Sequence, residues 1–236
     1  MKLNVGVPNS MHVAAMTQAW EYSLTGDDIG QAMATADRLG FNKCMLGEHF
    51  IIPQDHIGLS GDHYVHGTVA LSFLAGRTKT MKLSSSVSIL PLQSPIVQAK
   101  AWSTLDWLSG GRATALFGVG WLKEEFDMLN VDFHQRGRMA DEYGLIITNL
   151  LELKGISPSN ITDACLCSVV PPLTSTLEDM CKTHISVTPL IVSAGVKTGI
   201  HILYQNPRDV GADRVADAVA AFELYGGPII VVDIGT

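Results

Sequence analysis

Residues 81–121 read MKLSSSVSILPLQSPIVQAKAWSTLDWLSGGRATALFGVGW, and they predict a strand, a helix and a second strand in succession. The first strand covers 81–90 and is unusual in holding four serines. The helix is marked by Ser94 as its N-cap and Pro95 at its first position, and the second strand covers 112–117. Because the chain crosses over through a helix between them, the two strands are expected to be parallel.

The same alternation extends upstream of this stretch. Strands are predicted at 2–7 and 42–46, and helices follow the Gly26-Asp27-Asp28 cap and cover 64–75. The apolar faces expected on the two best-marked helices are Ile29, Met33, Ala36 and Leu39, with Gly40 as the stop, and Val97, Ala101, Leu105 and Leu108, with Gly110 as the stop. Four strand-helix units in a row predict a parallel α/β fold, either the start of a (β/α) barrel or a doubly wound sheet.

Downstream of residue 145 the α/β pattern continues with different spacing. Helices are predicted at 145–153 and 213–224, with Val215, Val219 and Phe222 on the apolar face of the second, and strands at 161–169, 187–192 and 229–232. Pro171-Pro172 predicts a break, and the capping box Ser175-Thr176-Leu177-Glu178 predicts the start of a short helix. No low-complexity linker separates this part from the rest of the chain.

Composition is that of a globular protein of 236 residues, with 47% hydrophobic and 17% charged residues. A net charge of -7 disfavours nucleic acid or an anionic membrane as a partner. The sequence has no apolar run long enough to span a membrane and no signal-like N-terminus, so a cytoplasmic location is expected. The four cysteines, Cys44, Cys165, Cys167 and Cys181, lack the paired spacing of a zinc site and are expected to be buried, reduced thiols.

Polar and small residues follow the predicted strands where the active sites of barrel enzymes lie, at the carboxyl ends. Glu48 and His49 end the second strand, and Gly118 and Gly120 end the fourth, where missing side chains would let a planar cofactor approach the backbone. Two plainer interpretations stay open: His49 as a structural or surface histidine, and the glycines as a simple turn.

The segments SSSVSILPLQSP, AKAWSTLDWLSGGR and GVGW, continued by Glu125-Phe126 and Arg136-Gly137-Arg138, resemble the luciferase-like monooxygenase family over about residues 1–140. The resemblance implies the first four units of a (β/α)8 barrel, an oxidoreductase activity, and reduced FMN or coenzyme F420 as cofactor. The cofactor would lie against Glu48, His49, Ser86, Val87, Gly118 and Gly120, and His49 would also be a catalytic residue. The second half of the barrel is missing, so its sheet edges are open. We therefore expect weak flavin binding, unless another chain completes the barrel as in a homo-oligomer.

A second set of motifs lies between 168 and 236: SVVPPLT, GVKTGI, YQNPRDVGADR and DIGT. Phosphoryl transfer to a hydroxyl requires a carboxylate near that hydroxyl, cationic positioning groups, and donors or a metal around the phosphates. Asp213 is the candidate base and Arg214 the candidate substrate anchor. Asp233, Gly235 and Thr236 would begin a phosphate or cation loop. The alternative for Asp213 is an acid placed at a helix N-terminus by the macrodipole.

These motifs resemble type III pantothenate kinase over about residues 141–236. The resemblance implies part of an actin-like (ribonuclease H-like) α/β fold, ATP with a divalent cation and optionally a monovalent one, and a pantothenate pocket lined by Tyr204 and Gly211. The family's opening Asp-Xaa-Gly-Asn-Thr phosphate loop is missing, and the sequence ends inside the second phosphate loop. We therefore expect kinase activity to be absent.

The two resemblances meet in a seam at residues 137–145, GRMADEYGL, where Asp141-Glu142-Tyr143 fits either family. We expect domains at 1–140 and 141–236, joined within one continuous helix. Three interpretations remain: a flavin- or deazaflavin-dependent oxidoreductase acting on a small molecule, a pantothenate kinase of coenzyme A biosynthesis, and a non-functional fusion of two fragments.

Overall fold

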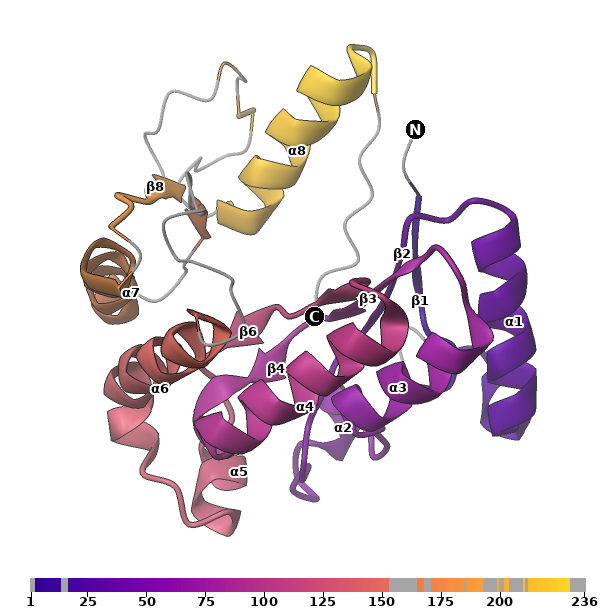
Figure 1. Ribbon diagram of the computed structural model, residues 1–236, viewed down its shortest axis with the longest axis horizontal. Coiled ribbons are helices and arrows are strands. Elements are labelled where there is room, and N and C mark those ends of the chain that lie inside the picture. Colours follow the sequence, from indigo (N-terminus) through magenta and orange to yellow (C-terminus); the bar gives the residue numbers. More distant parts are fainter. Residues whose placement is uncertain are drawn as a thin grey trace. The chain divides into compact units, whose positions relative to one another are not determined.

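The computed structural model describes residues 3–13, 17–152, 165–167, 171–184, 186–192, 199, 202–203, 210 and 212–229. The chain divides into two compact units, Lys2–Ile147 and Thr148–Thr236. Figure 1 shows the elements of both units, and each unit is described by itself. Among the described residues, no helix has the length and apolar character needed to cross a membrane.

The first unit is built on a parallel sheet with the order β1-β2-β3-β5. These strands are Asn4–Gly6, Lys43–Leu46, Lys82–Ser85 and Ala113–Thr114. The third and fourth predicted strands continue beyond a break as β4, Ser88–Ile89, and β6, Phe117–Gly118, which also pair in parallel. The third strand is interrupted at Ser86 and Val87, which are joined by a cis peptide bond, and the fourth at Ala115 and Leu116. The predicted parallel α/β fold is therefore confirmed, with each of its last two strands divided in two.

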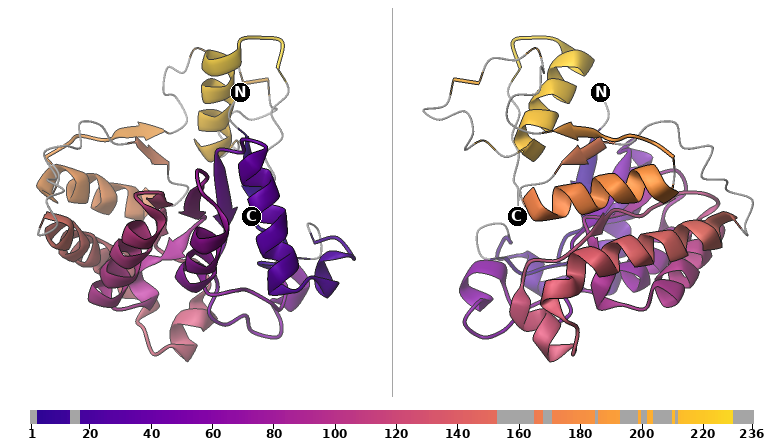
Figure 2. Two further views of the ribbon diagram at one scale, coloured as in Figure 1. Left: turned by 45° about the vertical axis from the view of Figure 1, so that its right-hand side comes forward. Right: turned by 90° about the vertical axis from the view of Figure 1, so that its left-hand side faces the viewer.

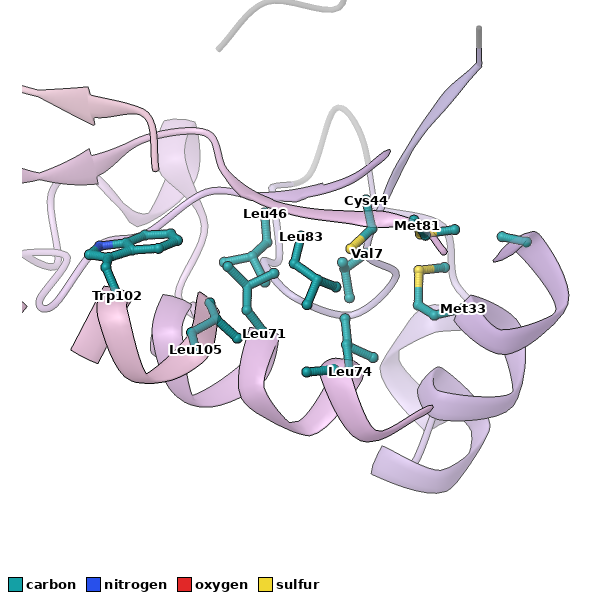
Figure 3. Close-up of a cluster of buried hydrophobic side chains, with 12 residues drawn as sticks. Val7, Met33, Cys44, Leu46, Leu71, Leu74, Met81, Leu83, Trp102 and Leu105 are labelled. Atoms are coloured by element: carbon teal, nitrogen blue, oxygen red, sulfur yellow. The ribbon is translucent and has the colours of Figure 1, made fainter. Parts of the chain in front are cut away.

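Three long helices connect the strands and cover one face of the sheet: α1 (Gly26–Arg38), α3 (Gly67–Arg77) and α4 (Pro95–Ser109). Between helices and strands lies a core in which Leu71, Leu83 and Leu105 are fully buried (Figure 3). The shorter elements are η1 (Glu21–Ser23), α2 (Ile57–Ser60), η2 (Leu90–Leu92), α5 (Lys123–Met128) and η3 (Phe133–Gln135). Helix α6, Arg136–Glu152, contains the whole of the 137–145 seam.

Helix α1 begins and ends close to where the sequence predicts. Its N-cap is Thr25, whose hydroxyl accepts from the Asp28 N–H while the Asp28 carboxylate accepts from the Thr25 N–H. Gly40 follows the helix with a φ of +85°, as a glycine stop requires. Met33 and Ala36 are buried as predicted, but Leu39 is 70% exposed, because it lies beyond the last turn and no longer points at the sheet.

Helix α4 buries a different face from the predicted one. Val97 and Leu108 are 59% and 57% exposed, whereas Gln98 and Trp102 are buried beside Leu105. Gln98 can lie in the core because its side-chain amide donates a 2.8 Å hydrogen bond to the carbonyl of Leu90. The helix is therefore rotated toward a polar residue that simple apolar periodicity excludes.

In the second unit, β7 (Cys165–Cys167) and β8 (Leu190–Val192) pair in parallel. They lie between α7 (Pro171–His184) and α8 (Ala212–Tyr225), as Figure 2 shows. The helix predicted from the capping box at Ser175 is present as α7, but its predicted start is wrong, because Pro171 at the first helical position begins it earlier. Helix α8 is confirmed: Val215 is buried and Val219 packs against it, although Phe222 is 51% exposed. The predicted strand 229–232 lies, beyond Ile229, outside the described residues.

The cysteine prediction is confirmed for the two cysteines whose side chains are described. Cys44 and Cys181 are buried and unpaired. Burial raises the pKa of the Cys44 thiol to about 11, so this side chain is a neutral thiol under physiological conditions. The side chains of Cys165 and Cys167 lie outside the described part of the chain.

Candidate functional site

The carboxyl ends of the strands bring the predicted N-terminal site residues to one edge of the sheet. Register pairs Leu46 of β2 with Ser85 of β3, and Ile89 of β4 with Gly118 of β6. Gly47, Glu48 and His49 directly follow β2, beside Ser86 and Val87, which follow β3. In parallel α/β folds this edge is where substrates and cofactors bind.

His49 is held by a buried carboxylate. Its Nδ1 lies 2.9 Å from Oε2 of Glu125, which comes from α5, and the Glu125 side chain is fully buried. The other oxygen of Glu125 accepts from the backbone N–H groups of Phe50 and Ile51. Because a carboxylate accepts at Nδ1, the His49 ring carries a proton there, and its tautomer and orientation are both fixed.

Two aromatic rings flank His49 and restrict it further. The Tyr64 ring lies 4.9 Å from the His49 ring and the Trp121 ring 6.0 Å away, both edge-on. The Tyr64 hydroxyl donates to the carbonyl of Ser60 across 2.7 Å. Burial raises the pKa of Tyr64 and the negative charge of Glu125 adds to the rise, so Tyr64 is a neutral hydrogen-bond donor.

Glu48 points into the protein. Its Oε1 accepts from the Gly67 N–H at the start of α3 and its Oε2 from the Ser88 hydroxyl, both across 2.8 Å, and the residue is only 5% exposed. His66 Nδ1 lies 3.7 Å from Oε1. Glu48 therefore ties the end of β2 to α3 and β4. Its predicted contact with a cofactor stays a prediction.

Contacts with neighbouring side chains explain why both predicted positions, 118 and 120, hold glycine. A Cβ added to Gly118 would lie 2.6 Å from Cγ2 of Val87. Gly120 has a φ of +80°, and a Cβ there would lie 2.7 Å from the ring of Phe126 and 2.9 Å from Ile89. Protein atoms already fill these positions, so Gly120 is explained as a turn and a packing site. Val87, 39% exposed, is the side chain that Gly118 leaves room for.

Glu125 is a residue of the candidate site that lies on a helix, so the ends of the predicted strands do not reveal it. The sequence does contain a signal for it. Glu125 lies three residues after Leu122 and four before Leu129, on the face of α5 that Phe126 buries. A charged residue in the middle of an apolar helix face indicates a buried partner.

The C-terminal site residues fall mostly outside the described residues. Asp213 and Arg214 lie in the first turn of α8, and Arg214 is exposed, while the side chain of Asp213 is not described. Tyr204, Gly211, Asp233, Gly235 and Thr236 lie outside the described part of the chain. Within the described residues, no group of three or more histidine, cysteine, aspartate or glutamate side chains could hold a metal ion.

Two family models match the chain, each over more than half of it. The model described as luciferase-like monooxygenase matches residues 3–161, and the model described as type III pantothenate kinase matches residues 115–236. The chain belongs to both families. Their matches overlap over 115–161, which contains the seam at 137–145, so the two-part resemblance is confirmed.

Solved structures similar to the chain include three oxidoreductases. The monooxygenase RslO1 from Streptomyces bottropensis is 19% identical, with a TM-score of 0.48, over 70% of this chain and 45% of that one. The oxygenating constituent of 3,6-diketocamphane monooxygenase from Pseudomonas putida was solved with FMN. It is 20% identical, with a TM-score of 0.49, over 64% of this chain and 39% of that one.

The third is the coenzyme F420-dependent tetrahydromethanopterin reductase from Methanopyrus kandleri, which is 21% identical, with a TM-score of 0.40, over 56% of this chain and 30% of that one. The chain thus spans less than half the length of each of the three.

Proposed function

We propose that the first unit is the cofactor-binding part of a flavin- or deazaflavin-dependent oxidoreductase of the luciferase-like type, folded as the first four units of a (β/α)8 barrel. The observation that carries the proposal is His49, which buried Glu125 fixes after the carboxyl end of β2, at the edge of the sheet where Val87 packs against Gly118. Membership of the luciferase-like family supports it.

The arrangement gives His49 a defined chemical role. With Nδ1 hydrogen-bonded to Glu125, Nε2 would be the ring nitrogen that meets a ligand, and in this tautomer it would accept a hydrogen bond. Ser86 supplies an exposed hydroxyl and Val87 an exposed apolar surface, which suit the polar edge and the flat face of a tricyclic ring. FMN or F420 would supply the redox chemistry, and the chain would bind and orient the ring.

We further propose that this unit binds its cofactor weakly and turns over no substrate by itself. The chain spans less than half the length of the matched structures, and in barrels of this kind the loops after strands seven and eight commonly hold a phosphate. Loss of such a site removes the charged hydrogen bonds that dominate binding of phosphorylated cofactors.

Titration of the purified protein with reduced FMN and, separately, with F420 tests this proposal through absorbance and fluorescence quenching. We expect weak, saturable binding that His49→Ala abolishes and the exposed control His134→Ala leaves unchanged. Absence of saturable binding of both cofactors would refute the assignment. Substrate turnover that depends on His49 would refute the proposed inactivity.

A second candidate function rests on the pantothenate kinase match over 115–236. Here Asp213 would act as the base, Arg214 as the substrate anchor, Tyr204 and Gly211 would line the pantothenate pocket, and Asp233, Gly235 and Thr236 would bind ATP phosphates or a cation. We propose that kinase activity is absent, because the family's first phosphate loop has no counterpart in the sequence. ATP-dependent phosphorylation of pantothenate that is lost in Asp213→Asn would refute this.

We propose that the chain is a chimera of two fragments with domains 1–140 and 141–236, and that it is cytoplasmic. The overlap of both family matches across α6 supports a join inside that helix. Reading the source DNA across the codons for residues 138–145 tests it. A single open reading frame across these codons in genomic DNA would establish that the fusion is natural. An interrupted reading frame would contradict a natural fusion.

A further inference from the structure

Within the part of the chain that the structure describes, the parallel sheet of the first unit ends in two unpaired edges, at β1 and at β5. Within the described residues, β1 pairs only with β2, and β5 pairs only with β3. Leu3 accepts from the Asn42 N–H and Val7 donates to the Met45 carbonyl, so by alternation the backbone groups of Asn4 point away from β2. At the other edge, both backbone groups of Leu116 bond toward Ser85 and Ser88, so those of Ala115 point outward.

Apolar surface accompanies both open edges. Beside β1 lies a hollow of about 330 Å³ lined mainly by apolar residues, among them Val5, Pro8, Met11, Met33 and Trp20, and the Trp20 side chain is 57% exposed. Along the fourth strand, Leu116 and Phe117 are 39% and 37% exposed. Soluble proteins normally protect such edges with charge or cover, because unpaired strands with apolar flanks recruit another strand.

We infer that a second copy of this chain closes the sheet, with the fourth strand of each copy pairing with β1 of the other. The four strands of the sheet are parallel and lie in sequence order. Two such sets make eight parallel strands, which is the number in a closed (β/α)8 barrel. The inference rests on the sheet edges and holds whether or not a flavin binds.

The symmetry of such a dimer follows from the strand directions. A two-fold axis parallel to the strands keeps all eight parallel and makes two equivalent contacts, each between unlike edges. Leu116 and Phe117 of one copy would then meet the apolar hollow beside β1 of the other. The carboxyl ends of all eight strands would surround one mouth, so that each His49 faces loops of the partner copy.

The mass of the full chain in solution, measured by light scattering after size-exclusion chromatography, tests the inference first. We expect twice the chain mass of 25.4 kDa at micromolar concentration. Proline substitution removes an outward N–H without disturbing the inner ladder. Asn4→Pro and Ala115→Pro are each expected to raise the dimer dissociation constant by about tenfold or more, unlike the controls Asn4→Ala and Ala115→Ser. A monomeric wild-type chain overturns the inference.

Mixing the two proline variants distinguishes unlike-edge pairing from pairing of like edges. In the mixed dimer one contact carries both prolines and the other carries none, so mixing is expected to restore association. If Asn4→Pro dissociates the dimer and Ala115→Pro does not, β1 pairs with β1 and the inference is wrong.

Cross-linking gives an independent result should either proline variant fail to fold, as judged by circular dichroism. With a short bis-maleimide, the variants Asn4→Cys and Ala115→Cys are expected to cross-link when mixed, above the background of the wild-type cysteines. Neither variant alone should cross-link above that background. Equal cross-linking of Asn4→Cys with itself overturns the inference.

Discussion

His49 and Glu125 are 76 residues apart in sequence, and their side chains meet across 2.9 Å between Nδ1 and Oε2. The contact joins the loop after β2 to helix α5, and the same carboxylate also accepts from the Phe50 and Ile51 N–H groups. Glu125 therefore both orients His49 and closes the loop that carries it. Its fully buried position means that none of these hydrogen bonds can be replaced by water when the carboxylate is lost.

Replacing Glu125 with glutamine is expected to lower the free energy of unfolding by about 1–3 kcal/mol. An amide has one acceptor oxygen in place of two, and its NH₂ group would face N–H donors. Urea unfolding measures the loss. Glu124→Gln, the neighbouring substitution on a partly exposed residue, should change the stability by much less. Equal effects of the two variants would contradict the proposed role of Glu125.

Asp37 gives the fold a pH-dependent link between the end of α1 and the start of β3. Burial of this carboxyl favours its neutral form, but hydrogen bonds from the Thr80 hydroxyl and the N–H groups of Lys79, Thr80 and Met81 outweigh that effect and lower its pKa. Because the folded-state pKa is depressed, the stabilisation is present above the unfolded pKa of about 3.9 and is lost as the pH falls through the folded value.

Asp37→Asn is accordingly expected to lower the free energy of unfolding by about 1–2 kcal/mol at neutral pH. The loss is modest because the carboxylate is partly exposed. The difference from wild type should shrink below pH 4. Chemical unfolding at a series of pH values measures it. The control Asp27→Asn removes a surface ion pair with Arg77 and should cost less at every pH. A stability difference between wild type and Asp37→Asn that grows as the pH falls would contradict the lowered pKa of Asp37.

Local patterns predict the order of strands and helices in this fold, because parallel β/α units require strand, crossover and strand in succession. They also place Glu48 and His49 correctly at the end of β2. What the sequence pattern misses depends on contacts between distant residues. The buried face of α4 is set by Gln98 and its bond to Leu90, and the orientation of His49 by Glu125. Apolar periodicity selects a face of α4 without Gln98, and no local pattern identifies the distant His49 as the partner of Glu125.

Within the described residues, the Arg112 guanidinium donates five hydrogen bonds and forms no salt bridge. The acceptors are the carbonyls of Ala75, Thr78, Met81 and Ser109 and the Thr78 hydroxyl. These groups end α3 and α4 and begin β3. Arg112→Lys is expected to lower the unfolding free energy by about 2–4 kcal/mol, because an ammonium group cannot reach acceptors placed for a planar fork.

Thermal and urea unfolding measure the effect of Arg112→Lys. Arg138→Lys is the matched control. The Arg138 side chain is 75% exposed and, within the described residues, forms an ion pair with Glu142 one helical turn away, a geometry in which lysine serves equally well. If both variants unfold at the same denaturant concentration as wild type, the five hydrogen bonds of Arg112 contribute nothing to stability.

Gly120 and Gly76 are expected to respond in opposite directions to alanine. Gly120 has a φ of +80°, and its added Cβ would overlap Phe126, so Gly120→Ala should cost roughly 2–4 kcal/mol. Gly76 lies within α3 with open space around an added Cβ, so Gly76→Ala should stabilise by up to about 1 kcal/mol. Urea midpoints of the two variants measure both. A tolerated alanine at 120 would mean that the turn after β6 can relax away from Phe126 and Ile89.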